Sequence, residues 1–300
     1  MHRGSVLLAM MAAFVMRIGA EEPTGIAAPQ ANVEKLSGVF EFTEGPAADS
    51  AGNVFFTDQP NDRIMKWSIE GELTTFMQPS GRANGLCFDK HGFLWACADE
   101  KNQLWRISPE KEIEVIVANH DGTLLNGPND LWIRPDGGLY FTDPFYKRPY
   151  WDRGEIMEQP CQGVYYLAPD RKTITRVVDD LEQPNGIIGT PDGKTLYVTD
   201  IKGKNTYAYT IQEDGSLTGK RLFCEMGSDG MTIDNQGNVY LTGKGVFVFD
   251  KTGKQIDHID IDEPWTANVS FGGKDMDYLF ITASKGLYRL KTRVKGVGSQ

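Results

Sequence analysis

Cysteine is scarce in this chain, with only four among 300 residues. None of them forms a Cys-x-x-Cys pair, and four are too few to staple a small disulfide scaffold. A chain of this length can bury its own hydrophobic core, so we expect the cysteines to be structural. In an oxidising compartment one or two bridges could form between them. The four are Cys87, Cys97, Cys161 and Cys224.

Positive charge is also in short supply. The chain holds 31 Lys and Arg against 41 Asp and Glu, a formal net charge of −10. No Lys/Arg-rich run offsets this balance. An acidic surface repels phosphate backbones, which argues against nucleic acid as a partner.

Several catalytic motifs are missing as well. The chain has no Gly-x-Ser-x-Gly elbow, which argues against a serine hydrolase. It has no His-Glu-x-x-His motif and no glycine-rich phosphate loop of the Walker or Rossmann type. Beyond the first twenty residues no stretch keeps a sustained helical period.

The first twenty residues resemble a secretory signal. A basic start at His2 and Arg3 precedes the short apolar stretch Ser5–Met16, and Ile18-Gly19-Ala20 resembles a cleavage site before Glu21. The apolar stretch is too short to span a bilayer comfortably, although an uncleaved N-terminal anchor is the alternative. We therefore expect residues 21–300 to form a single exported domain, periplasmic or secreted, with no membrane contact after cleavage.

The positive signal is a repeat. Five times an acid or amide stands eight residues before a turn glycine that leads into an aromatic-rich strand. A sixth, looser copy pairs Asn268 with the turn at 272–277. A polar residue held at one place in every unit predicts a converging ring. The five pairs are Glu44 and Gly52, Asn84 and Gly92, Asn129 and Gly137, Asn185 and Gly193, and Asp229 and Gly237.

Between these landmarks the chain reads as short strands bounded by Gly, Asp, Asn and Pro. Four strands recurring every forty to fifty residues predict an all-β, six-bladed propeller with four antiparallel strands per blade. The last unit stops after three strands, and an orphan strand at Gly38–Phe42 is expected to close it and remove two exposed edges. A pair of β-sandwiches is the alternative, but it leaves the constant spacing unexplained.

The third unit carries an insertion, Pro144–Gln162, with the aromatic residues Phe145, Tyr146, Tyr150 and Trp151. It follows the second strand of its blade, so we expect it to overhang one face. Long loops in compact domains are often lids or binding loops, and a structural flap is the alternative.

The ring offers hard oxygen ligands. Glu44 and Asp229 supply carboxylates, Asn129 and Asn185 supply amide oxygens, and no ring position is cysteine or histidine. Oxygen-only ligation suits calcium first, with magnesium, manganese or zinc as alternatives. Asn and Asp are also common turn residues, but turn formation does not require glutamate in the first copy.

An ordered set of motifs at matching blade positions resembles the SMP-30/gluconolactonase/LRE-like family. The set covers the chain from about residue 36 to 290 and consists of Glu44-Gly45-Pro46, Gly127-Pro128-Asn129-Asp130, Phe141-Thr142-Asp143-Pro144, Gln183-Pro184-Asn185-Gly186 and Ser228-Asp229-Gly230-Met231.

The resemblance implies a six-bladed propeller with one divalent cation, usually calcium, held by Glu44, Asn129, Asn185 and Asp229. It also implies hydrolysis of sugar lactones. Asn84 matches no ligand of the family, so we expect it to line the substrate pocket. Animal members carry an arginine where this chain has Gly127, which leaves the identity of the lactone open.

These observations predict a metal-dependent lactonase of the gluconolactonase type, in which the cation polarises the lactone carbonyl. Asp229 is the expected general base, Asn129 is expected to touch both ion and substrate, and Trp265 could wall the pocket. Two alternatives stay open: an esterase acting on phosphotriesters or aryl esters at the same site, and a non-catalytic propeller that binds sugars, peptides or cell-envelope components.

Overall fold

The computed structural model describes residue 1, residues 25–150, residue 154 and residues 156–298. The predicted secretory signal lies outside this part of the chain, apart from Met1, and stays a prediction. Among the residues described, no helix has the length and apolarity needed to cross a membrane.

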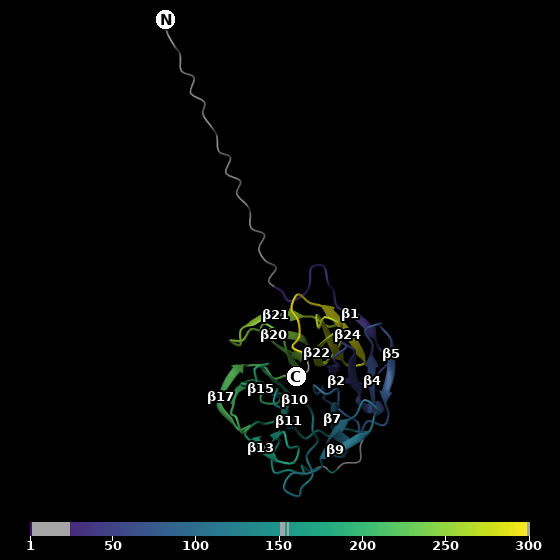
Figure 1. Ribbon diagram of the computed structural model, residues 1–300, viewed down its shortest axis with the longest axis vertical. Coiled ribbons are helices and arrows are strands. Elements are labelled where there is room, and N and C mark those ends of the chain that lie inside the picture. Colours follow the sequence, from purple (N-terminus) through teal and green to yellow (C-terminus); the bar gives the residue numbers. More distant parts are fainter. Residues whose placement is uncertain (2–24, 151–153, 155, 299–300) are drawn as a thin grey trace.

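The described residues form six antiparallel sheets of four strands each, arranged around a central axis (Figure 1). The first three blades contain β2 (Thr43–Ala48), β3 (Val54–Asp58), β4 (Arg63–Trp67) and β5 (Leu73–Met77); β6 (Leu86–Phe88), β7 (Leu94–Ala98), β8 (Gln103–Ile107) and β9 (Ile113–Val117); and β10 (Leu131–Ile133), β11 (Leu139–Asp143), β12 (Gly163–Leu167) and β13 (Ile174–Val178).

The next three contain β14 (Pro184–Gly189), β15 (Thr195–Asp200), β16 (Asn205–Ile211) and β17 (Leu217–Cys224); β18 (Met231–Ile233), β19 (Val239–Gly243), β20 (Gly245–Phe249) and β21 (Gln255–Ile259); and β22 (Thr266–Gly272), β23 (Tyr278–Ala283) and β24 (Gly286–Lys291) together with β1 (Glu34–Ser37). Two 3-10 turns, η1 (Gln59–Asn61) and η2 (Asp99–Lys101), follow β3 and β7. The six-bladed propeller predicted from the sequence is confirmed.

The last blade is closed by the N-terminal strand, as predicted, but with residues further upstream. β1 pairs antiparallel with β24, with Glu34 opposite Arg289. The predicted segment at 38–42 is not a strand. Its Phe40 is instead a core side chain that meets the ring of Phe56 edge-on at 5.1 Å. Within this segment Phe40 alone is buried, between blades six and one, while Val39 is 71% exposed.

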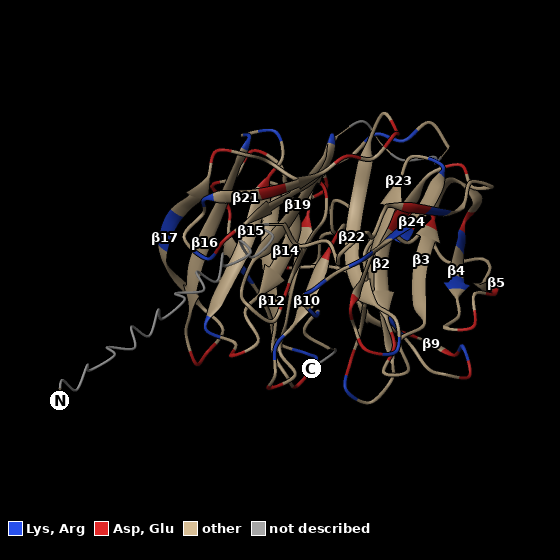
Figure 2. Ribbon diagram, turned by 90° about the horizontal axis from the view of Figure 1, so that it is seen from above, with Lys and Arg blue, Asp and Glu red and all other residues tan. Residues whose placement is uncertain are grey.

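The hydrophobic core lies between the blades. Six clusters of buried side chains each combine residues from two neighbouring sheets. Phe55 of blade one, for example, packs edge-on against Phe88 of blade two at 4.9 Å. Full burial of one such side chain contributes about 1.5–3 kcal/mol, so each interface is stabilised by several of them. Seen from the side, charged residues gather mainly in the loops at the two ends of the strands (Figure 2).

Polar bonds also tie neighbouring blades together near the axis. The penultimate residue of the second strand is threonine in five blades and Cys97 in blade two. Thr57 donates its hydroxyl proton to the carbonyl of Asn84 at 3.1 Å, and Thr142 donates to the carbonyl of Asn185 at 2.7 Å. Each hydroxyl therefore joins one blade to the inner strand of the next. Cys97 is fully buried at the equivalent place, and all four cysteines are unpaired, as expected for structural residues.

The C-terminal segment crosses one end of the propeller. Thr292 forms an isolated antiparallel β-bridge with Ala27, and Gly296 forms another with Asp234 of blade five. Figure 1 marks the C-terminus close to the axis. Val297 and Gly298 line the adjoining end of the central channel.

We expect Thr142→Val to destabilise the protein by about 2 kcal/mol. The valine fills the same space but loses the bond to the carbonyl of Asn185 and the bond accepted from the amide of Asp130 at 3.1 Å. Urea unfolding measures the change. Thr74→Val on the exposed edge strand β5 is the control, with an expected effect within about 0.5 kcal/mol. Equal losses in the two variants would contradict a role for the bridge.

Candidate functional site

The five predicted polar residues stand at or just before the innermost strands. Glu44 and Asn185 lie within β2 and β14, and the other three come two residues before β6, β10 and β18. Four of the five are followed by glycine. A Cβ atom on Gly45 would lie 2.1 Å from the carbonyl oxygen of Asn84, and one on Gly186 would lie 2.6 Å from that of Asp229. Glycine is needed there because neighbouring inner strands touch, and this contact draws the polar residues together.

The sixth blade departs from the expected pattern. The amide of Gly85 donates to the carbonyl of Asn129, and the amide of Gly230 donates to the carbonyl of Ala267 in the same way, both at 2.7 Å. Thr242 also donates its hydroxyl proton to Ala267, as Thr57 does to Asn84. The ring position of blade six is therefore Ala267, and Asn268, the sixth predicted copy, lies one residue further along. After Asn268 four residues of β22, Val269 to Gly272, pair with β23, whereas three residues of β10 pair with β11 after Asp130. The hairpin of blade six is therefore one residue longer.

Asp229 is the best-connected member of the ring. The amide group of Asn185 donates to its Oδ1 at 2.8 Å, and the indole N–H of Trp265 donates to its Oδ2 at 2.7 Å. Trp265, predicted to wall the pocket, is 38% exposed and so stands at the edge of the site. Both carboxylate oxygens of Asp229 are held in fixed directions.

Glu44 is almost completely buried, and its Oε2 accepts a bond from the amide of Gly45 at 3.0 Å. Burial raises the pKa of Glu44 well above its usual value, and the nearby charge of Asp229 raises it further. Burial also raises the pKa of Asp229, against the opposing effect of the Trp265 hydrogen bond. A positive charge placed beside these two acids would therefore stabilise their ionised forms.

Residues 144–150, the first described stretch of the insertion, extend over this ring. Asn185 donates to the hydroxyl of Tyr146 at 2.7 Å, and the hydroxyl of Tyr150 donates to Gln59 of blade one at 2.8 Å. The segment thus links blade three to blade one and overhangs one face of the propeller, as expected. Trp151 lies outside the described residues.

Arg148 is a site residue that the sequence did not reveal, because a single arginine within an aromatic loop belongs to no repeat. Its guanidinium lies 4.6 Å from the centre of the Tyr146 ring. Its positive charge opposes the rise in the pKa of both Glu44 and Asp229. The insertion therefore brings a cation to an acidic ring.

Two amides of the ring are open to further partners. Asn84 is 1% exposed, and among the described residues neither its Oδ1 nor its Nδ2 has a hydrogen-bond partner. Leaving such a group unsatisfied costs about 1–3 kcal/mol per atom, so a ligand or water is expected there. Asn129 is 2% exposed, and no hydrogen bond of its side chain is found within the described part of the chain.

These residues fit an oxygen-ligated cation. Glu44 keeps Oε1, and Asn185 keeps Oδ1, outside the hydrogen bonds found among the described residues, and the side chain of Asn129 is likewise available. The described residues hold no group of three or more His, Cys, Asp and Glu side chains that could hold a metal ion. A site here would rest on two carboxylates completed by amide oxygens, a donor set that suits calcium.

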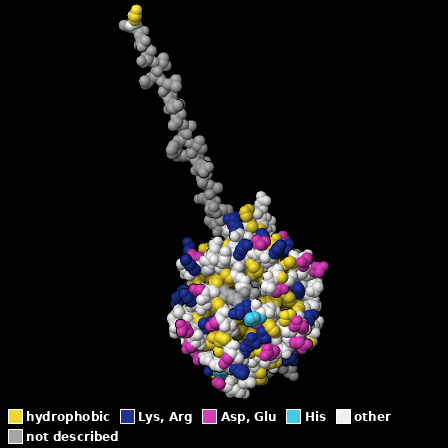
Figure 3. Space-filling view, in the orientation of Figure 1, with side chains coloured by type: hydrophobic (Ala, Val, Ile, Leu, Met, Phe, Trp, Pro, Cys, Tyr) yellow, Lys and Arg dark blue, Asp and Glu magenta, His cyan; other side chains and the backbone are white. Residues whose placement is uncertain are grey.

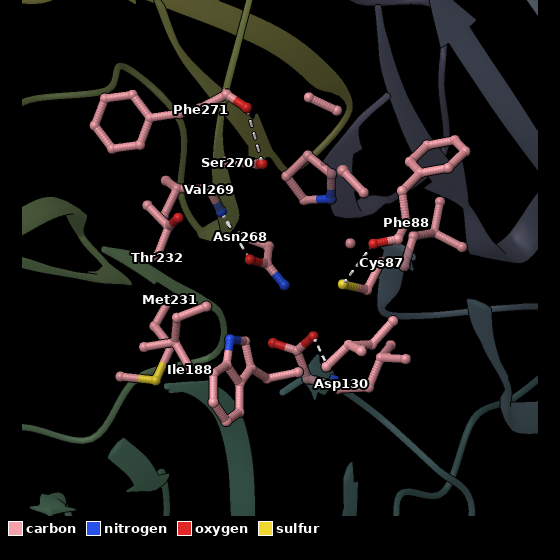
Figure 4. Close-up of a pocket in the computed structure, with 18 of the residues that line it drawn as sticks. Cys87, Phe88, Asp130, Ile188, Met231, Thr232, Asn268, Val269, Ser270 and Phe271 are labelled. Carbon is pink, nitrogen blue, oxygen red and sulfur yellow. Dashed lines mark hydrogen bonds between the residues drawn. The ribbon is translucent and has the colours of Figure 1, made fainter. Parts of the chain in front are cut away.

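Beyond the ring the channel widens into a chamber of about 110 Å³. Its walls come from residues that follow the ring positions on the inner strands, and Figure 4 shows Asp130 and Asn268 facing one another across it, with Cys87 nearby. Burial raises the pKa of Asp130 to about 7 and that of Cys87 to about 12. Within the chamber Asp130 Oδ1 accepts a hydrogen bond from the amide of Leu131 at 2.9 Å, and the nearby side chain of Asn268 opposes the rise in the pKa of Asp130.

On the face that Figure 3 shows, Lys and Arg side chains gather beside a His near the middle, and acidic side chains lie mainly toward the rim, with apolar side chains between them. The ring and the insertion together make the strongest candidate site in the described structure.

Comparison with known proteins gives one consistent result. The profile of the SMP-30/Gluconolactonase/LRE-like region matches residues 42–285. A gluconolactonase of Zymomonas mobilis subsp. mobilis is 29% identical over 295 residues, with 88% of this chain and 82% of the relative covered. The structure of a gluconolactonase from Xanthomonas campestris is similar with a TM-score of 0.83 at 28% identity, over 89% of this chain and 91% of that one.

The fold likeness extends to a more distant protein. A regucalcin from Agrobacterium tumefaciens, described as calcium-binding, is similar with a TM-score of 0.74 at 20% identity, over 88% of this chain and 95% of that one. At this identity the likeness concerns the fold alone.

We expect Arg148→Gln to bind calcium more tightly than the unaltered protein, by roughly three- to tenfold. The substitution removes one screened positive charge that competes for the same two carboxyl groups. Isothermal titration with calcium chloride measures the affinity. Arg171→Gln, in an exposed turn between β12 and β13, is the control. An unaltered affinity in Arg148→Gln would mean that its charge does not act on the ring.

Proposed function

This chain belongs to the SMP-30/gluconolactonase/LRE-like family, and from that membership we propose that it is a lactonase that opens sugar lactones at the polar ring. The observation that carries the proposal is the ring itself. The buried acid Glu44 and the half-buried acid Asp229 lie in this ring with an unpartnered buried amide, Asn84. Groups that are costly to bury and left without internal partners are typical of sites that bind and react.

We propose that one divalent cation, calcium first, is held by oxygen atoms of Glu44, Asn129, Asn185 and Asp229. When bound, such an ion supplies a Lewis acid for the carbonyl of the lactone. The described residues contribute the negative charge that retains it. The regucalcin described as calcium-binding supports this choice of ion by likeness of fold.

Asp229 is the proposed proton acceptor. A water molecule adds its oxygen to the lactone carbonyl carbon and gives a proton to the carboxylate of Asp229. The bond between that carbon and the ring oxygen then breaks, and the proton passes to the leaving oxygen, which yields a hydroxy acid. Asn185 and Trp265 fix the two carboxylate oxygens, so the orientation of the base is set before substrate arrives.

Asn84 and Asn129 are the proposed substrate-binding amides. Asn84 can both donate to a sugar hydroxyl and accept from one, and it has no partner to give up within the described structure. Tyr146 and Arg148 approach from the insertion, so a substrate bound here would lie between ring and insertion.

Chelation tests the proposed reaction. The purified protein should hydrolyse D-glucono-δ-lactone, lose this activity when stripped with a chelator, and regain it on addition of calcium. The same preparation is assayed with aryl esters and phosphotriesters. Hydrolysis of these alone would favour the esterase alternative, whereas a folded protein without hydrolytic activity or bound ion would favour a binding propeller.

We expect Asp229→Asn to lower kcat by about 10²–10⁴-fold, the range typical for loss of a general base. Asn84→Ala should mainly raise KM, by about two- to tenfold, because it removes hydrogen bonds to substrate and leaves the base in place. Steady-state kinetics with the lactone separate the two effects. Similar losses of kcat in both variants would argue against Asp229 as the base.

A further inference from the structure

Three buried aspartates end the second strands of their blades. Asp58 closes β3, Asp143 closes β11 and Asp200 closes β15, and none is more than 4% exposed. The second strands of the other three described blades end in Ala98, Gly243 and Ala283. Nothing in the proposed reaction uses these aspartates directly.

Each aspartate accepts hydrogen bonds from two successive backbone amides. Asp200 accepts from Glu182 and Gln183, both at 2.9 Å. Asp143 accepts from Asn126 at 2.9 Å and from Gly127 at 2.8 Å.

Asp58 accepts from the amides of Glu41 at 3.0 Å and Phe42 at 3.3 Å, but both bonds end on one oxygen, Oδ1. Its other oxygen pairs with Arg63 at 2.8 Å.

The bonded amides always precede a ring residue by the same number of positions. They stand three and two residues before Asn185, Asn129 and Glu44 in turn. These three are the non-catalytic members of the proposed ligand set. The blade of Asn84, which matches no ligand of the family, and the blade of Ala267 lack the aspartate.

Asp229, in the fifth blade, is held differently. Asn185 and Trp265 bond its side chain directly. The amide of Thr242 donates to the hydroxyl of Ser228 just before it, at 2.6 Å.

We propose that Asp58, Asp143 and Asp200 are positioning residues that aim the ligand side chains of blades one, three and four at the ring centre. The inference rests on the proposed function, because it presumes a cation at the ring. In Asp143 and Asp200 each carboxylate oxygen holds one of two neighbouring N–H groups, which fixes both the position and the rotation of the loop. In Asp58 one oxygen holds both amides and the other holds Arg63. An asparagine can accept through only one oxygen, and its NH₂ group faces the remaining donor.

Asp234 serves as a matched control, because it is an aspartate of the same kind whose role is purely structural. Asp234, at the opposite end of blade five, is 1% exposed. It accepts bonds from the amides of Gln236 and Asn238, both at 2.9 Å. It closes a hairpin turn by the same chemistry but precedes no ring residue.

The test compares Asp200→Asn with Asp234→Asn in the full chain. Urea unfolding gives the loss of stability of each, and isothermal titration of the stripped protein with calcium chloride gives the affinity. Both variants are expected to unfold at lower urea. Only Asp200→Asn should weaken calcium binding, by about 10–100-fold, as for other residues that orient metal ligands. Asp143→Asn, which acts on Asn129, is the second variant if Asp200→Asn does not fold.

The outcomes are distinguishable. Unaltered calcium affinity in the folded aspartate variants, or an equal loss in Asp234→Asn, overturns the positioning role while the proposed function stands. An unaltered protein that binds no divalent cation and hydrolyses no lactone overturns the proposed function, and the positioning role falls with it.

Discussion

Two carboxyl groups placed together near the axis of the propeller, Glu44 buried and Asp229 half-buried, are the constraint that the rest of the structure accommodates. Glu44 lies where burial and the charge of Asp229 both oppose its ionisation. Folding alone gains nothing from such a pair, since apolar side chains would fill the same space at lower cost. The surrounding structure therefore holds the two carboxyl groups in place, and the free energy for this comes from the hydrophobic interfaces between blades.

The surroundings act at three levels along each inner strand. Glycines such as Gly45 and Gly186 let neighbouring strands approach closely enough for the polar residues to meet. Threonines such as Thr142 tie each strand to the next blade. Arg148 from the insertion and Trp265 from the sixth blade then bring a positive charge and an N–H donor close to the ring. This last level adds asymmetry to that already present in the blades, where Cys97, Asp130 and Ala267 break the repeat.

Much of this was visible in the sequence because the repeat is regular. The spacing of eight residues fixed the ring positions of five blades, including Glu44 and Asp229, and the recurring strands predicted the number of blades. The sixth position was assigned one residue too far, to Asn268, because the hairpin of blade six is one residue longer than that of blade three, so the eight-residue spacing does not hold there. The strand expected at 38–42 lies at Glu34–Ser37, since a segment with one buried aromatic residue, Phe40, resembles a strand. Arg148 stayed hidden because its place depends on the path of one loop.

Closure of the last blade by β1 also sets an order of events during synthesis. Roughly 250 residues separate β1 from β24, its pairing partner. At about 5–20 residues per second, a ribosome needs on the order of 12–50 s to make them. Through that interval β1 has no native neighbour, and the face of blade one that packs against blade six stays uncovered. The propeller therefore becomes one cooperative body only when its final strand has left the ribosome, and the nascent chain must be kept from pairing with other chains until then.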